Sequence, residues 1–132
     1  MKPVNFLSKA IYVSRSKKKG RGVFANTALK AGVVIEVAPV IVISKEDRKF
    51  IDKTLLHDYI FEWGRDSKRC CMALGCVSLY NHSYNSNCEY EMDFRAEIIT
   101  IRTVRAIKNG EELFINYNGV WNNETPVWFD VK

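Results

Sequence analysis

The segment Tyr80-Asn81-His82-Ser83-Tyr84-Asn85-Ser86-Asn87 decides how the rest of this sequence is interpreted. Amide, hydroxyl, imidazole and phenol groups follow one another here, directly after the apolar stretch 70–77. We expect polar groups in such a position to be held by the protein core. Taken alone, the segment is also typical of a loop tied down by side-chain hydrogen bonds, in which His82 is a structural donor rather than a catalyst.

Two further segments lie on either side of it in the sequence. Lys19-Gly20-Arg21-Gly22-Val23-Phe24 contains backbone without side chains, which lets a ligand approach closely. A basic G-x-G is more often only a turn, and no helix follows it to support a Rossmann phosphate site. Gly110-Glu111-Glu112-Leu113-Phe114-Ile115-Asn116-Tyr117 is a glycine turn that leads into a strand ending in tyrosine. By itself, this second segment is ordinary β-structure.

Most of the chain is predicted to form short strands. Runs rich in β-branched residues favour strands over 33–37 and 40–43, separated by Ala38-Pro39. The other expected strands cover 10–13, 23–25, 59–63, 88–92, 97–103 and 112–117. In such a β-rich chain the loops, rather than helices, must carry the chemistry.

One helix is expected. Ser44 can cap it by accepting a hydrogen bond from the Asp47 N–H, and the acidic first turn suits the positive end of the helix dipole. The helix is predicted to end by about Asp58. Its buried stripe is predicted to consist of Phe50, Ile51, Leu55 and Leu56.

The composition indicates one globular domain. A chain of 132 residues has the usual size of a single domain, and 47% hydrophobic with 12% aromatic residues can form a core. Twenty Lys and Arg against 15 Asp and Glu give a net charge of +5. This excess permits an anionic partner, although a basic solvated surface is the favoured explanation.

No membrane span, secretion signal or metal site is predicted. The chain has no run of ~18 to 20 apolar residues and its N-terminal segment has no continuous apolar region, so we expect a soluble, intracellular protein. Reduced thiols are favoured for the four cysteines at positions 70, 71, 76 and 88. Zinc is disfavoured because an adjacent Cys-Cys pair lacks the spacing with which two thiolates hold one ion.

In their order and spacing, the three segments together resemble the SET domain, the fold of most protein lysine methyltransferases. Its G-x-G motif matches 20–22, its N-H-S motif with a following Asn matches 81–83 and Asn87, and its G-E-E-L motif running to a tyrosine matches 110–117. Residues 72–75 resemble the short viral and bacterial stand-alone members. The resemblance covers about 8–121, with 122–132 as a C-terminal tail, so we expect a single SET-like domain over 1–132.

The resemblance implies a mainly β fold of small curved sheets with a C-terminal pseudoknot and one short helix. It implies that S-adenosylmethionine binds in a pocket on one face and leaves as S-adenosylhomocysteine. The target lysine would enter through a narrow channel from the other face. Short members of the family can also form homodimers to complete their sites.

Roles for individual residues follow from the same resemblance. The cofactor's methionine moiety would meet the backbone of Gly20, Arg21 and Gly22. Asn81 and His82 would contact the cofactor, chiefly around the adenine. Further roles are implied for Tyr117 at the methyl-transfer point, Tyr59 near the cofactor and the lysine channel, and Ile115 in the channel. Trp121 in the tail would cover the cofactor or complete the channel, and packing of the tail aromatics onto the core is an equal alternative.

The reaction would need alignment more than a strong base. Holding amine, methyl and sulfur in line supplies ~7 to 11 kcal/mol. Deprotonating a lysine with a pKa of ~10.4 at pH 7 costs roughly 4.6 kcal/mol, and a partly desolvated channel lowers that cost. Neither His57 nor His82 is therefore assigned as a base.

Two departures from the family pattern keep alternatives open. Val37 stands where many members have a channel tyrosine, and Ile115-Asn116 stands where Phe or Tyr and Asp are common. An aliphatic Ile115 leaves room for more than one methyl group.

The leading hypothesis is a protein-lysine methyltransferase acting on a histone or histone-like protein, with a chromatin-associated location in a eukaryotic host. The first alternative is a catalytically weak SET-like module that binds the cofactor or a peptide. A nucleic-acid module using the cations of 15–21 is the weakest hypothesis, because those cations lack interleaved aromatics.

Overall fold

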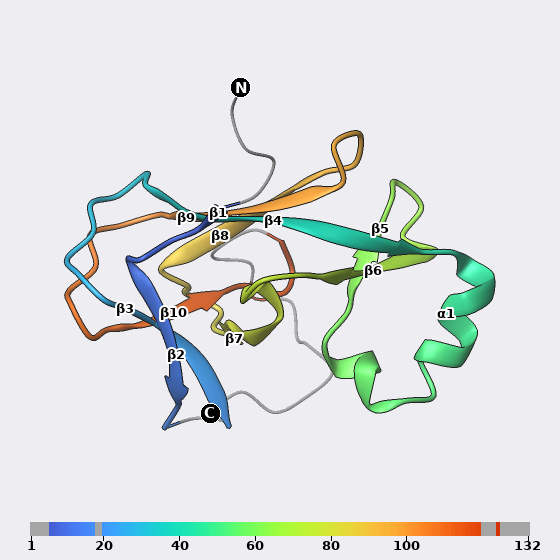
Figure 1. Cartoon of the computed structure of the whole chain (residues 1–132), viewed down its shortest axis with the longest axis horizontal. Coiled ribbons are helices and arrows are strands. Elements are labelled where there is room, and N and C mark those ends of the chain that lie inside the picture. The colour runs from blue at the N-terminus through green and yellow to red at the C-terminus, as the bar shows by residue number, and fades with distance from the viewer. Residues whose placement is uncertain (1–5, 18–19, 120–123, 125–132) are drawn as a thin grey trace.

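The computed structural model describes residues 6–17, 20–119 and 124 and forms two β-sheets with little helix (Figure 1). The larger sheet has the strand order β5-β6-β4-β9-β8, with β1 also paired to β4. Its strands are β1 (Phe6–Leu7), β4 (Val34–Ile43), β5 (Phe61–Trp63), β6 (Arg69–Ala73), β8 (Cys88–Asp93) and β9 (Ile98–Thr103). The mainly β fold expected from the sequence is confirmed.

The smaller sheet has the order β2-β3-β10-β7. Its strands are β2 (Ile11–Arg15), β3 (Arg21–Ala25), β7 (Asn81–His82) and β10 (Glu112–Ile115). β10 runs antiparallel to β3 and parallel to β7. The last strand among the described residues, β10, therefore lies between the N-terminal hairpin and the segment that contains Asn81 and His82.

β4 corrects one sequence prediction, because 33–37 and 40–43 belong to one continuous strand rather than two. Val34 to Pro39 pair with β9, and Val40 to Ile43 pair with β6 on the opposite edge. Pro39 lies where the strand passes from one partner to the other, and its carbonyl accepts the Leu74 N–H at 3.0 Å. A proline at this changeover is tolerated without a break in the strand.

The helical segment begins as predicted but ends early. In α1 (Lys45–Ile51), the Ser44 hydroxyl accepts the Asp47 N–H at 3.1 Å. A separate 3₁₀ turn, η1 (Leu55–Asp58), follows. Thr54 is the N-cap of this turn, and its hydroxyl accepts the Leu56 N–H and donates to the Ile51 carbonyl. These side-chain bonds compete with continuation of the α-helix.

The predicted buried stripe of the helix is wrong. Phe50 is 70% exposed and Leu55 74% exposed, and neither α1 nor η1 has a buried residue. α1 lies at one end of the larger sheet, beyond the ends of β4 and β6, and does not cover a sheet face (Figure 1). Its apolar side chains therefore have no layer to pack against.

A single apolar core connects the two sheets. Its largest fully buried members are Trp63, Tyr80, Ile35, Ile99, Ile101, Leu113 and Ile115. The four cysteines are free thiols, and burial raises the pKa of Cys71 and of Cys88 to about 12. They behave as apolar core residues at neutral pH.

Within the described part of the chain, no group of three or more His, Cys, Asp or Glu is placed to hold a metal ion. None of the helices described there is long and apolar enough to cross a membrane.

Candidate active site

The three sequence motifs meet in the smaller sheet. In β10, Glu112 is opposite Phe24 of β3 and Ile115 is opposite His82 of β7. The G-x-G turn, the N-H-S segment and the strand that leads to Tyr117 are thus neighbours, although they are far apart in the sequence. The pairing of β10 with both β3 and β7 is what brings the three motifs together.

Glu112 joins the three motifs through its carboxylate. Its Oε1 accepts the Ser16 hydroxyl at 2.8 Å and its Oε2 accepts Asn81 Nδ2 at 2.8 Å. Asn81 Nδ2 also donates to the Arg21 carbonyl at 3.1 Å. A Cβ on Gly22 would collide with Glu112 Oε2, so any other residue at this position would displace the carboxylate from its partners.

Sequence reasoning assigned no role to Glu112. The only available signal was that the residue lies in the G-E-E-L motif. Its partners come from two distant segments, which become visible only once the strands are paired.

Tyr117 is held from two directions. Its main-chain N–H donates to His82 Nδ1 at 3.0 Å, and its hydroxyl donates to the Tyr80 carbonyl at 2.7 Å. Because Nδ1 of the buried His82 accepts, its ring proton is on Nε2 in this arrangement. The His82 and Tyr117 rings are also in contact, with centroids 5.1 Å apart. His82 is therefore a positioning group for Tyr117 whatever else it contacts.

Asn87 fastens β10 from the side of the N-H-S loop. Its Oδ1 accepts the Phe114 N–H at 2.8 Å, and its Nδ2 donates to the Glu112 carbonyl at 2.8 Å. The side chain is almost fully buried. These bonds show why an asparagine follows the N-H-S motif in this chain, since an amide can satisfy an N–H and a C=O at once.

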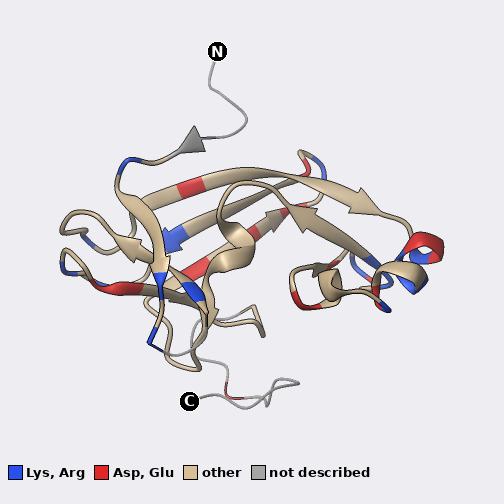
Figure 2. Cartoon of the chain, turned by 60° about the horizontal axis from the view of Figure 1, so that its bottom comes forward, with Lys and Arg blue, Asp and Glu red and all other residues tan. Residues whose placement is uncertain are grey.

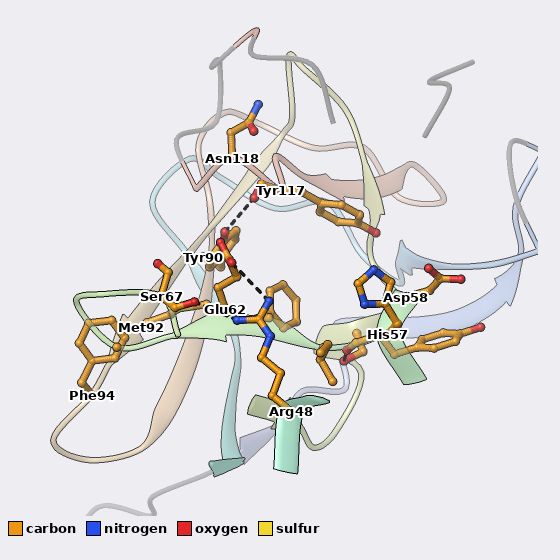
Figure 3. Close-up of a pocket in the computed structure, with 15 residues that line it drawn as sticks. Arg48, His57, Asp58, Glu62, Ser67, Tyr90, Met92, Phe94, Tyr117 and Asn118 are labelled. Carbon is orange, nitrogen blue, oxygen red and sulfur yellow. Dashed lines mark hydrogen bonds and ion pairs between the residues drawn. The ribbon is translucent and has the colours of Figure 1, made fainter. Parts of the chain in front are cut away.

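A cavity of about 560 Å³ opens beside Tyr117 (Figure 3). Tyr59, Phe61, Tyr90 and Met92 line it together with Tyr117. The structure thus brings together Tyr59 and Tyr117, the two residues implied for the reaction centre. Tyr90 and Phe61 were missed from the sequence, and their rings are in contact with each other at 5.6 Å between centroids.

The other implied site residues that the structure describes do not line this cavity. Gly20, Arg21, Gly22, Asn81 and His82 belong to the cluster of motifs in the smaller sheet. Ile115 is fully buried in the core. Trp121 lies outside the described residues. Tyr117 belongs to both places, because its backbone contacts His82 while its side chain lines the cavity.

Burial raises the pKa of two cavity tyrosines, Tyr90 and Tyr117. Desolvation, followed by the nearby Tyr59 and Tyr90, raises the pKa of Tyr117 to about 12. Desolvation, followed by Glu62, raises the pKa of Tyr90 to about 12. Both hydroxyls are therefore donors, as their bonds to the Tyr80 and Tyr117 carbonyls also show.

The far side of the cavity carries both signs of charge. Arg48 lines it and forms ion pairs with Asp52 at 3.4 Å and Glu62 at 3.3 Å. Its guanidinium also donates to the Ser67 carbonyl at 2.8 Å. Acidic and basic residues lie close together around α1 (Figure 2). This side of the cavity therefore presents paired positive and negative groups rather than an electrostatic potential of one sign.

Comparisons with known proteins identify the family. A SET domain family model matches residues 20–118. A curated relative from Schizosaccharomyces pombe, a histone-lysine N-methyltransferase specific for H3 lysine 37, is 37% identical over 116 residues. The alignment covers 87% of this chain and 74% of that protein.

Solved structures agree with this assignment. A Plasmodium falciparum protein described as a histone methyltransferase superposes with a TM-score of 0.66 and 27% identity, over 87% of this chain and 98% of its own. A chain of the Chaetomium thermophilum Polycomb Repressive Complex 2 shares the fold, with a TM-score of 0.69 and 21% identity over 83% of this chain and 15% of its own. On the family match, the curated relative and the arrangement of the three motifs, the chain belongs to the SET domain family.

Proposed function

We propose that this protein transfers a methyl group from S-adenosylmethionine to the ε-amine of a lysine in a histone. Its family and its curated relative make it a protein-lysine methyltransferase. The observation that carries the proposal for the site is the placement of Tyr117, whose backbone and hydroxyl are both fixed while its ring faces the cavity. The relative named for H3 lysine 37 supports a histone as the substrate.

The residues of the motif cluster fit the proposed cofactor. Gly20 is exposed, has open space where a Cβ would stand and adopts a φ of +50° that favours glycine, so a ligand can approach its backbone closely. Gly22 is buried, and its missing side chain makes room for the Glu112 carboxylate. We assign Gly20, Arg21, Gly22, Asn81 and His82 to cofactor binding. When bound, S-adenosylmethionine supplies a methyl group on a sulfonium, an excellent leaving group that needs no metal or covalent intermediate.

Tyr117 and Tyr80 would position the transferred methyl group. The Tyr80 carbonyl and the Tyr117 hydroxyl oxygen are 2.7 Å apart, so two oxygen atoms face the same small region. Oxygen atoms placed in this way can align a methyl group through weak C–H···O contacts. The hydrogen bond that holds them together fixes their geometry before the substrate arrives, which is the main requirement of a reaction dominated by alignment.

The aromatic cavity would receive the lysine side chain. Tyr59, Tyr90 and Tyr117 offer ring faces to its methylene groups and its cationic end. The protonated hydroxyls of Tyr90 and Tyr117 do not act as bases at neutral pH. The lysine would lose its proton to solvent, and the desolvation that raises the tyrosine pKa values would lower that of the amine.

The proposal is tested by incubating the protein with labelled S-adenosylmethionine and histone H3. We expect label on H3 with the wild type and at least 100-fold less with Tyr117→Phe. Tyr12→Phe is the matched control, because Tyr12 stacks on Phe24 outside the cavity and its hydroxyl has no part in the site. Cofactor binding without transfer to any histone would contradict the proposal and favour a binding module.

A further inference from the structure

Glu36 is a buried carboxylate that the proposed reaction leaves unexplained. It lies in β4, next to a shift in the register between β4 and β9, and its exposed fraction is 0%. No ion pair to Glu36 occurs among the described residues. Burying a carboxylate without a cation carries a desolvation penalty, which the hydrogen bonds of Glu36 must offset.

Both carboxylate oxygens bind the short segment 76–80. Oε2 accepts the Cys76 N–H at 2.6 Å, and Oε1 accepts the Tyr80 hydroxyl at 2.9 Å. Between these two points lies the 3₁₀ turn η2 (Val77–Leu79), which has no side-chain cap of its own. Glu36 therefore holds both ends of the turn with one planar group.

The same turn reaches the two cavity tyrosines on its other side. The Ser78 hydroxyl donates to the Tyr59 carbonyl at 2.8 Å, and the Tyr80 carbonyl accepts the Tyr117 hydroxyl at 2.7 Å. Tyr80 is thus held by its own hydroxyl at Glu36 while its carbonyl holds Tyr117. A displacement of η2 would move the acceptor of the Tyr117 hydroxyl directly.

We propose that Glu36 is a positioning residue for methyl transfer, which acts by fixing Cys76 and Tyr80 so that the Tyr80 carbonyl holds the Tyr117 hydroxyl. The inference rests on the proposed function for its catalytic consequence. Its structural part, the dependence of the Tyr117 hydroxyl on Glu36, holds whatever the substrate is.

Three substitutions separate this role from simple packing. Glu36→Leu removes both acceptors. Glu36→Gln keeps a hydrogen bond to both partners. Its amide oxygen can accept the Cys76 N–H, and its amide nitrogen can donate to the Tyr80 hydroxyl oxygen. Tyr80→Phe removes one bond without changing the ring, and it provides the test if Glu36→Leu does not fold. Glu91→Gln is the matched control, since Glu91 is an exposed strand residue outside the cavity.

The first readout uses no substrate. The ¹³Cζ resonance of Tyr117, assigned by its loss in Tyr117→Phe, reports on the hydrogen bond of its hydroxyl. We expect this resonance to shift in Glu36→Leu and in Tyr80→Phe, and to stay near the wild-type position in Glu36→Gln and Glu91→Gln. An unchanged resonance in both Glu36→Leu and Tyr80→Phe would overturn the inference, even if the enzyme proves to act on another substrate.

The second readout is kcat per cofactor-binding site, with the number of sites titrated by calorimetry with S-adenosylhomocysteine. We expect Glu36→Leu to lower kcat roughly 10- to 100-fold with KM for the histone within about threefold, and Glu36→Gln to restore most of it. A purely structural role would reduce the number of sites and leave kcat per site unchanged, which would contradict the proposal. Absence of activity in the wild type, with the expected shifts of the Tyr117 resonance, would contradict only the proposed function.

Discussion

The main-chain N–H of Tyr117 donates to Nδ1 of His82 at 3.0 Å, so the last residue of the G-E-E-L segment depends on the histidine of the N-H-S segment for its position. The bond connects β10 to β7 just beyond the last residue pair of the two strands, Ile115 and His82. It explains how a buried histidine serves the site without acting as a base.

His82→Ala should therefore destabilise the protein more than His82→Asn. Alanine leaves the Tyr117 N–H without its acceptor, at a cost of about 1 to 3 kcal/mol, whereas the Asn Oδ1 can occupy the place of Nδ1. Urea unfolding followed by tyrosine and tryptophan fluorescence measures the difference. Equal losses of stability in the two variants would show that the bond to Tyr117 contributes nothing.

Gly22→Ala should cost stability because its Cβ would collide with the Glu112 carboxylate. We expect a loss of about 1 to 3 kcal/mol. Glu112→Ala should also destabilise, because Ser16 and Asn81 lose their acceptor. In the double variant the collision is absent. Its loss of stability should therefore be smaller than the sum of the losses in the two single variants. Simple additivity in urea unfolding would contradict the close approach of these residues.

The stability of the fold should fall at high pH. The pKa values of Tyr90 and Tyr117 are raised to about 12, and that of Tyr80 is raised well above its ordinary value, all mainly by burial. The unfolded chain releases these protons near pH 10 while the folded chain keeps them, so the free energy of unfolding decreases as pH rises above 10. Each tyrosine contributes about 1.4 kcal/mol per pH unit up to its folded pKa.

Tyr117→Phe should remove one of these contributions and give a shallower decrease between pH 10 and 11. The control variant is Tyr12→Phe, which removes a hydroxyl from a tyrosine that is exposed. Parallel curves for the wild type and Tyr117→Phe would show that the Tyr117 hydroxyl is not buried as described.

Glu36→Gln should gain stability relative to the wild type as pH increases. Burial raises the pKa of Glu36, more than the bonds from Cys76 and Tyr80 lower it. A raised pKa in the folded state favours the fold below the ordinary value of a glutamate and costs stability as pH rises through the folded value. Unfolding measured from pH 4 to pH 8 tests this, and a difference that does not change with pH would contradict it.

Phe50→Ser should change stability by less than about 0.5 kcal/mol, because the ring is largely exposed on α1. Leu113→Ala, at a fully buried position of β10, should cost about 2 to 5 kcal/mol. A large loss at Phe50 would show that α1 packs against the rest of the chain after all.

The sequence predicted the strands and the family better than it predicted the burial of the helix. The motifs around Gly22, His82 and Tyr117 implied the family, and most strands appeared close to the expected ranges. The helical periodicity of Phe50 and Leu55 suggested burial, but periodicity shows only that apolar residues share a face. Whether a sheet lies against that face depends on the tertiary arrangement.

The site was predicted only where a motif marked it. Tyr117 and Tyr59 were implied by resemblance and do line one cavity. Glu36, Tyr90 and Glu112 were missed because their importance comes from partners at distant positions in the sequence. The Glu36 side chain, for example, meets Cys76 and Tyr80 only in the folded chain, because these partners are 40 and 44 residues further along the sequence.

Methyl transfer to a histone lysine, and its dependence on Tyr117, is tested most directly by mass spectrometry of histone H3 after a single turnover with enzyme in excess. The wild type and Tyr12→Phe should add methyl groups to a lysine at the same rate, while Tyr117→Phe should bind S-adenosylmethionine normally and transfer at least 100-fold more slowly. Undiminished transfer by Tyr117→Phe, or unmodified H3 with the wild type, would contradict the account.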